Sequence, residues 1–125
     1  IAVLVNTQQS LEELQKLVIK IILRNPLALK KIPPINFPRD INVFRAVVDR
    51  IGLKTITISE GLCEQSFESG EALVSWMRTA GPCAGFRSAV KDLYRDIIFK
   101  KIKDLVNARG GIKVTFRFIR FVGCK

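Results

Sequence analysis

The spacing of apolar positions changes along the chain and predicts strands that alternate with helices. Ile1–Val5 is a continuous apolar run rich in β-branched residues, which is typical of a strand buried on both faces. Ser10 and Glu13 have the spacing of a capping box that begins a helix, and Asn25-Pro26 ends that helix. The apolar residues between them recur at helical spacing: Leu11, Leu14, Leu17, Val18, Ile21 and Ile22.

The next segment predicts an irregular connection, a helix and a strand. Residues 26–38 hold four prolines among apolar and basic residues, which indicates either a static connection or a lid packed over a surface. Asp40 is a favourable N-cap for a second helix, and Gly52 ends it. Leu53–Ser59 alternates as a strand does. We expect the inward positions of the second helix to be Val43, Phe44, Val47, Val48 and Ile51.

The last third of the chain predicts two more helices and a closing strand. One helix is expected from about Ser69 to Gly81-Pro82, and a long one from near Ala84 to Ala108. Gly110-Gly111 then leads into a strand that begins at Ile112. Strands that alternate with helices predict a single domain, residues 1–125, with an α/β layer architecture.

The closing strand alternates apolar with basic side chains and admits two interpretations. The aromatic residues are Phe116, Phe118 and Phe121, and the basic ones are Lys113, Arg117 and Arg120. On an open sheet these side chains would stack nucleobases and contact phosphates. The chain lacks the aromatic residue that follows glycine in an RNA-recognition strand, and its apolar helices predict covered sheet faces. We therefore interpret the phenylalanines as core residues, with a bulge or two-sided burial near Ile119, where the alternation fails.

Composition narrows the function classes without selecting one. The net charge of +10 is compatible with nucleic acid, an anionic membrane or anionic substrates, and equally with a fragment whose acidic remainder lies elsewhere. The lack of histidine excludes Ser-His and Cys-His nucleophiles, and three widely spaced cysteines argue against a metal site. Three free thiols predict a reducing, cytoplasmic setting, and no apolar run approaches the roughly 20 residues of a transmembrane helix. Because the chain opens within an apolar strand and without Met, we expect a fragment.

Several segments together resemble the C-terminal half of class I S-adenosylmethionine-dependent methyltransferases, whose Rossmann-like sheet has seven strands. Ile1–Val5 resembles strand five, residues 43–58 (VFRAVVDRIGLKTITI) resemble the helix-glycine-strand six unit, and residues 112–123 resemble strand seven. Residues 67–82 (FESGEALVSWMRTAGP) are similar to a helix of small-molecule methyltransferases, such as those of the juvenile hormone acid methyltransferase type. The resemblance covers nearly the whole chain.

The resemblance implies S-adenosylmethionine as cofactor and an antiparallel seventh strand between strands five and six. In the family, a glycine-rich loop after strand one and an acidic residue that ends strand two bind the cofactor. No such loop follows a strand here, because Gly110-Gly111 precedes a strand and Gly81 ends a helix. We therefore expect the missing N-terminal half of the same domain as a partner, and no activity from this chain alone.

The resemblance also implies a pocket for a small-molecule acceptor. Trp76, Arg78 and Phe86 flank the break at Gly81-Pro82, and Arg78 is suited to pair with a substrate carboxylate. Asn6 is a fourth candidate, because open α/β sheets bind ligands at the carboxyl ends of strands. In the alternative interpretation the aromatic residues are ordinary core, Arg78 is solvated and Asn6 is a turn residue. No catalytic residue is assigned, because methyl transfer to a carboxylate depends on positioning and needs no base.

The predicted function is S-adenosylmethionine-dependent methyl transfer to a small-molecule acceptor, performed only together with the N-terminal half. The alternative is a basic, non-catalytic module that binds nucleic acid or an anionic surface. Its candidate surface is the basic face from Lys91 to Arg109, which is otherwise an ordinary solvated helix face. A third class, a purely structural interaction domain, would pair through unpaired strand edges.

Overall fold

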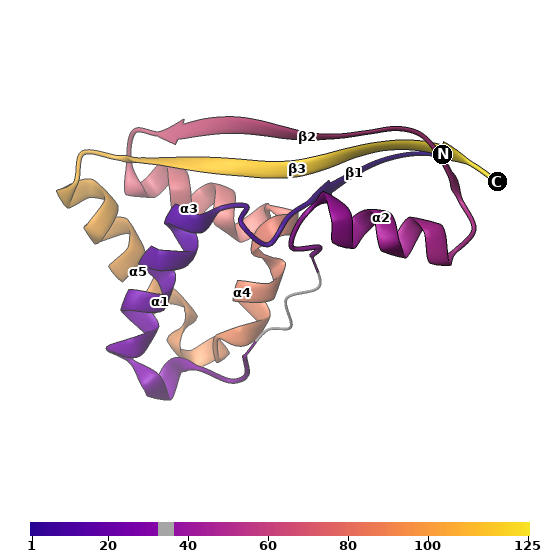
Figure 1. Ribbon diagram of the computed structural model, residues 1–125. Coiled ribbons are helices and arrows are strands. Elements are labelled where there is room, and N and C mark those ends of the chain that lie inside the picture. Colours follow the sequence, from indigo (N-terminus) through magenta and orange to yellow (C-terminus); the bar gives the residue numbers. More distant parts are fainter. Residues whose placement is uncertain (33–36) are drawn as a thin grey trace. The chain divides into compact units, whose positions relative to one another are not determined.

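A computed structural model describes residues 1–32 and 37–125 of the chain (Figure 1). The elements in chain order are β1 (Ala2–Asn6), α1 (Glu12–Leu23), the 3-10 turn η1 (Pro26–Ala28), α2 (Ile41–Arg50), β2 (Lys54–Phe67), α3 (Gly70–Thr79), the 3-10 turn η2 (Gly81–Cys83), α4 (Ala84–Ala89), α5 (Asp92–Ala108) and β3 (Ile112–Cys124). None of the described helices is both long and apolar enough to cross a membrane.

The described residues form two compact units. The sheet unit contains Ile1–Glu12, the described part of Ile35–Gln65, and Thr115–Lys125. The helical unit contains the described part of Glu13–Pro34 together with Ser66–Val114. The long strands β2 and β3 each contribute residues to both units.

The sheet is three-stranded and antiparallel, with β3 between β1 and β2. β1 pairs with β3 from Ala2 opposite Val122 to Asn6 opposite Phe118. The pairing continues past the end of β1, because Thr7 N donates to the Arg117 carbonyl oxygen at 2.9 Å. The predicted α/β class is confirmed as a mixture of helices with a small antiparallel sheet.

β2 is twice as long as the strand predicted from Leu53 to Ser59, since it runs from Lys54 to Phe67. Gly61 breaks the apolar alternation at this point without ending the strand. The Phe118 ring of the neighbouring strand lies over Gly61, where a Cβ atom would come within 2.6 Å of Phe118 Cζ. The small residue therefore accommodates a cross-strand aromatic side chain.

Helix α2 begins at Asp40 and packs on one face of the sheet, as Figure 1 shows. The predicted N-cap is confirmed, because Asp40 Oδ1 accepts hydrogen bonds from Asn42 N and Val43 N, both at 3.0 Å. The packing contact joins Phe44 of α2 to Phe121 of β3, with ring centroids 5.7 Å apart and ring planes at 69°. This edge-to-face pair joins α2 to the sheet.

The outer part of α2 differs from the prediction. Val43, Val47 and Ile51 were expected to face inward but are exposed, and only Val48 on this helix is fully buried. A single helix against a three-stranded sheet buries a narrow line of side chains, so one edge of the predicted apolar face stays in solvent. We call Val43, Val47 and Ile51 the α2 stripe.

The predicted two-sided burial of β1 is wrong, because Ala2, Val3 and Leu4 are exposed. Val3 and Phe121 are paired and share the α2 face, whereas Leu4 is on the opposite face. Within the sheet unit, α2 is the only described helix, so one face of β1 has no helix of that unit over it.

Burial of the phenylalanines of β3 is confirmed for one and corrected for two. Phe121 is 2% exposed, whereas Phe116 and Phe118 are half-buried. The buried positions change parity between Val114 and Ile119, which belong to different units. Each end of the strand thus contributes to the core of its own unit, and this accounts for the failed alternation.

The helical unit buries one continuous set of apolar side chains. Its fully buried residues on α3 and α5 are Leu73, Met77, Ile98, Phe99, Ile102 and Val106. α3 begins as predicted, because Ser69 Oγ accepts from Ala72 N at 3.2 Å. Gly70, at the start of α3, lies directly against the backbone of Lys103 on α5, so the two helices approach closely there.

The single long helix predicted from Ala84 to Ala108 is wrong, because the chain breaks between α4 and α5 at Val90-Lys91. Backbone hydrogen bonds join the residues at this break to the segment after α1. Lys30 N donates to the Ala89 carbonyl at 2.7 Å, and Lys91 N donates to the Ala28 carbonyl at 2.9 Å. The described first half of the proposed lid is therefore fixed by backbone hydrogen bonds, as in a static connection. Residues 33–36 of that segment lie outside the described residues.

Candidate acceptor site

Two of the predicted acceptor-binding residues meet on a third, Phe99 of α5. The guanidinium carbon of Arg78 lies 4.6 Å from the centre of the Phe99 ring. Phe86 of α4 meets the same ring edge-to-face, with centroids 5.6 Å apart and planes at 78°. Arg78 and Phe86 are thus held near each other by a buried aromatic ring. We call Arg78, Phe86 and Phe99 the arginine–aromatic cluster.

Arg78 combines a fixed position with access to solvent. Its Nη2 atom donates to Asp96 Oδ1 at 3.1 Å, and 49% of its side chain is exposed. An exposed single-contact ion pair of this kind contributes little to stability. The guanidinium has five N–H donors, so the contact with Asp96 leaves donors for a second carboxylate.

The C-terminus of α3, which carries Arg78, is fixed by a different arginine. Arg87 Nη1 donates to the carbonyl oxygens of Met77 and Ala80, at 2.7 and 2.8 Å. These bonds satisfy carbonyl groups that the helix end would otherwise leave unpaired. The cluster therefore stands on a helix end that is fixed by α4.

Trp76 faces another neighbour. Its ring lies 5.3 Å from that of Phe67, at the end of β2, with the planes tilted by 45°. Trp76 is half-buried. The interpretation of Trp76 as a core-edge residue suits this geometry better than a place beside Arg78.

Asn6 belongs to the sheet unit, at the last position of β1. It is opposite Phe118 in the β1–β3 register and is half-buried. Its backbone continues into Thr7, whose N–H joins the ladder. A strand-end position is therefore confirmed for Asn6, while a binding role stays a prediction.

Sequence reasoning missed Phe99 and Asp96, the residues that hold Arg78. Both are on α5, eighteen or more positions away from Arg78 in the chain. The helical spacing of apolar residues could have marked Phe99 as buried, because Ile98, Phe99 and Ile102 are on the same side of α5. Nothing in the linear pattern pairs either residue with Arg78.

Cys83 ends η2 and directly precedes α4, the helix that carries Phe86. Cys83 is buried, and burial raises the pKa of its thiol to about 11, although the nearby Arg87 offsets part of the effect. Cys63 and Cys124 are exposed. Among the described residues, no group of three or more Cys, Asp or Glu side chains is arranged to hold a metal ion.

The site can therefore orient an anionic small molecule through a cation that rests on an aromatic ring. Asp96, the carboxylate beside Arg78, accepts a hydrogen bond from the guanidinium. Neither a scan against protein-family models nor a search of curated proteins finds a match to this chain.

Proposed function

We propose that this chain is the acceptor-side half of a class I S-adenosylmethionine-dependent methyltransferase domain with a Rossmann-like fold. In the proposal it takes part in methyl transfer to a small carboxylic acid when joined to a cofactor-binding half. The strand order carries the proposal: β3 is antiparallel and lies between β1 and β2. The family places its antiparallel seventh strand between strands five and six in the same way.

The exposed apolar surface of the sheet unit supports a missing half. Val47 is 47% exposed and Ile51 is 64% exposed on the α2 stripe, and Leu4 on the edge strand β1 is 63% exposed. Edge strands and exposed apolar patches favour further pairing and packing. A cofactor-binding half would extend the sheet along β1 and cover the α2 stripe.

The chain itself does not fit S-adenosylmethionine. β1 runs into Thr7 without a glycine, and β2 runs into α3 with Gly70 alone. Gly70 allows the close approach of α3 to α5 instead of a cofactor, because a Cβ atom there would meet the backbone of Lys103. The glycine-rich turn that approaches a cofactor therefore has to come from the other half.

The arginine–aromatic cluster is the proposed acceptor-binding element. Arg78 would exchange its contact with Asp96 for a bidentate contact with the acceptor carboxylate, and Phe86 would contact the apolar part of the molecule. Such contacts orient the acceptor oxygen, and orientation is what an in-line transfer chiefly requires.

Titration calorimetry with S-adenosylmethionine tests the proposal. We compare the 125-residue chain with the longest native polypeptide that contains it, and expect binding by the longer polypeptide only. Equal binding by both would place the cofactor site in this chain and contradict the division into halves. No binding by either would reject the methyltransferase assignment.

A surface variant tests the proposed junction. In the longer polypeptide, Val47→Asp introduces a charge into the α2 stripe. Because the proposed cofactor-binding half covers the stripe, this charge should weaken cofactor binding at least tenfold, which corresponds to about 1.4 kcal/mol. Ala46→Asp introduces the same charge on another face of α2 and is the matched control. Equal effects of the two substitutions would argue against a covered stripe.

A further inference from the structure

α1 borders two hollows on the surface of the helical unit, one shared with the C-terminal half of α5 and the other with the turn after α5 and the start of β3. One hollow has a volume of about 340 Å³ and the other about 470 Å³. The first is lined by Ile21, Arg24, Asn25, Lys101, Asp104 and Leu105. The second is lined by Glu13, Lys16, Leu17, Lys20, Arg109, Gly111, Ile112 and Lys113. They follow one another along α1, and we call them together the basic groove.

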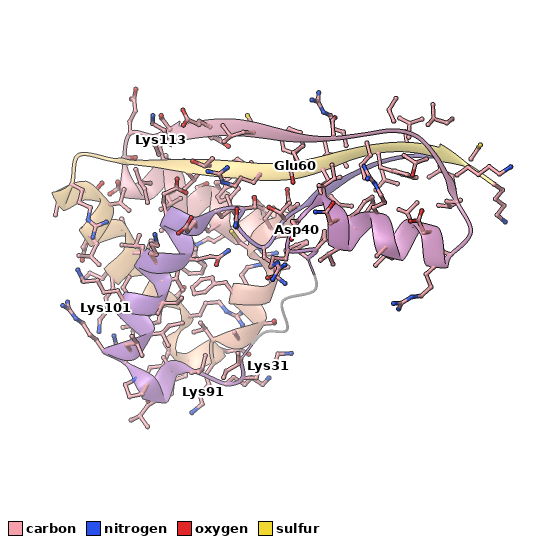
Figure 2. All side chains as sticks on the ribbon, viewed as in Figure 1. Lys31, Asp40, Glu60, Lys91, Lys101 and Lys113 are labelled. Atoms are coloured by element: carbon pink, nitrogen blue, oxygen red, sulfur yellow. The ribbon has the colours of Figure 1, made fainter. Side chains whose placement is uncertain are left out.

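Cationic side chains dominate the basic groove. The basic residues are Lys16, Lys20, Arg24, Lys101, Arg109 and Lys113, and the acidic ones are Glu13 and Asp104. Figure 2 labels Lys101 and Lys113 among these side chains. Lys101 Nζ donates to Asn25 Oδ1, which joins α5 to the end of α1. A concave surface with this excess of positive charge attracts an anionic partner.

Long aliphatic side chains stand beside the groove, on the helix α1 and on the 3-10 turn η1 that follows it. Lys16 and Lys20 are four residues apart on α1, and so are Ile19 and Leu23, while Arg24 directly follows the helix and Leu27 is on η1. Leu23 is 75% exposed and Leu27 is 71% exposed, while Ile19 is 55% exposed. An exposed aliphatic row alongside a cationic row is the pattern of a helix that lies in the interface of an anionic membrane.

The same surface is poorly suited to a single-stranded nucleic acid. Such ligands are bound by cationic grooves together with aromatic platforms on which bases stack. None of the described residues that line either hollow is aromatic. Exposed leucines beside lysines suit a lipid bilayer better, because the lysines can bind headgroup phosphates while the leucines contact the acyl chains.

We propose that this face of the helical unit docks on an anionic phospholipid bilayer. The basic groove binds headgroup phosphates and carboxylates, and Ile19, Leu23 and Leu27 enter the region between headgroups and acyl chains. Each cation near such a surface typically strengthens binding about fivefold, and physiological salt weakens the attraction. The docking is independent of the proposed methyl transfer.

Co-sedimentation of the chain with vesicles tests the docking. We expect partition onto phosphatidylcholine vesicles that contain phosphatidylserine, little partition onto pure phosphatidylcholine, and weaker binding as salt is added. The variant Lys16→Glu with Lys20→Glu should lose at least about tenfold in partition. The control variant Lys54→Glu with Lys100→Glu has the same net charge, but neither residue lines the groove, and it should stay within about threefold of the original chain.

The aliphatic row has its own variant. Ile19→Ser with Leu23→Ser leaves every charge in place and should reduce partition several-fold, because apolar burial contributes to interfacial binding. Far-ultraviolet circular dichroism checks that each variant is folded, and Lys16→Gln with Lys20→Gln replaces the double Glu variant if that one unfolds.

Three results would overturn the proposal. The first is the absence of partition onto anionic vesicles. The second is an equal loss in the groove and control variants, which would indicate a response to net charge alone. The third is binding to single-stranded RNA that anionic vesicles do not displace, which would make the groove a polynucleotide site.

Discussion

Substitution of Gly70 by alanine tests the close approach of α3 and α5 in the helical unit. A Cβ atom at this position would lie 2.6 Å from Lys103 Cα, and the obstacle is backbone rather than a flexible side chain. Gly70 N also donates to Asn107 Oδ1 at 2.7 Å, and Asn107 Nδ2 in turn donates to the Glu71 carboxylate at 3.2 Å. Added volume would therefore separate α3 from α5 and weaken a hydrogen-bonded junction.

The expected free-energy change combines three effects. Overpacking costs about 1–3 kcal/mol, and a weakened buried hydrogen bond adds about 0.5–1.5 kcal/mol. The higher helix propensity of alanine returns up to about 1 kcal/mol. We expect Gly70→Ala to lower the free energy of unfolding by about 2 kcal/mol, which lowers the urea midpoint by about 1 M for a slope on the order of 2 kcal/mol/M.

Urea unfolding followed by circular dichroism measures the effect, with Gly81→Ala as the control. A Cβ atom at Gly81 would meet nothing within 4 Å, so that variant should stay within about 0.5 kcal/mol of the original chain. If Gly70→Ala is as stable as Gly81→Ala, the close approach of α3 to α5 is wrong. The position of Arg78 over Phe99 would then lose its basis as well, because it depends on the same pair of helices.

Three further outcomes follow from single side chains. The folded state holds the Cys83 thiol neutral, with a pKa of about 11 against 9.0, so the free energy of unfolding should fall as pH rises through this interval. Cys83→Ala should lack that part of the fall, and an identical pH profile would contradict the burial. Hydrogen bonds from Val43 N and Arg39 lower the pKa of Asp40, so Asp40→Ala should lower the urea midpoint at neutral pH, and by less as the pH falls and the carboxyl of the folded state becomes protonated. In the assembled enzyme, Arg78→Ala should raise KM for a carboxylic acceptor about tenfold or more with Arg78→Lys intermediate, and an unchanged KM would refute the pairing.

Local signals in the sequence predicted local structure well. Asp40 caps α2 as expected, and Ser69 caps α3 at the predicted start of that helix, because a short polar side chain before a helical pattern acts on amides only two or three residues away. The alternation that began β2 was also read correctly at its start. Its predicted end at Ser59 is wrong, because the strand continues to Phe67 and the small Gly61 accommodates the Phe118 ring of the neighbouring strand.

The errors concern contacts made across the chain. The break at Val90-Lys91 contains no proline or glycine by which it could be predicted. Backbone groups of Ala28 and Lys30, about sixty residues away in the chain, stabilise it. The helical spacing of apolar residues shows which side chains of α2 could be buried, but it does not show how many elements cover the helix. The exposure of the α2 stripe therefore could not be predicted. Phe99 was missed as the support of Arg78 for the same reason, since only the fold brings α3 and α5 together.

The central claim is that this chain supplies the acceptor side of a methyl-transfer reaction. Transfer of a radiolabelled methyl group from S-adenosylmethionine to a mixture of small carboxylic acids tests it directly, with the longest native polypeptide and the 125-residue chain assayed side by side. The account predicts labelled methyl esters from the longer polypeptide and none from the chain alone. Labelled product from the chain alone, or no labelled product from either, would contradict it.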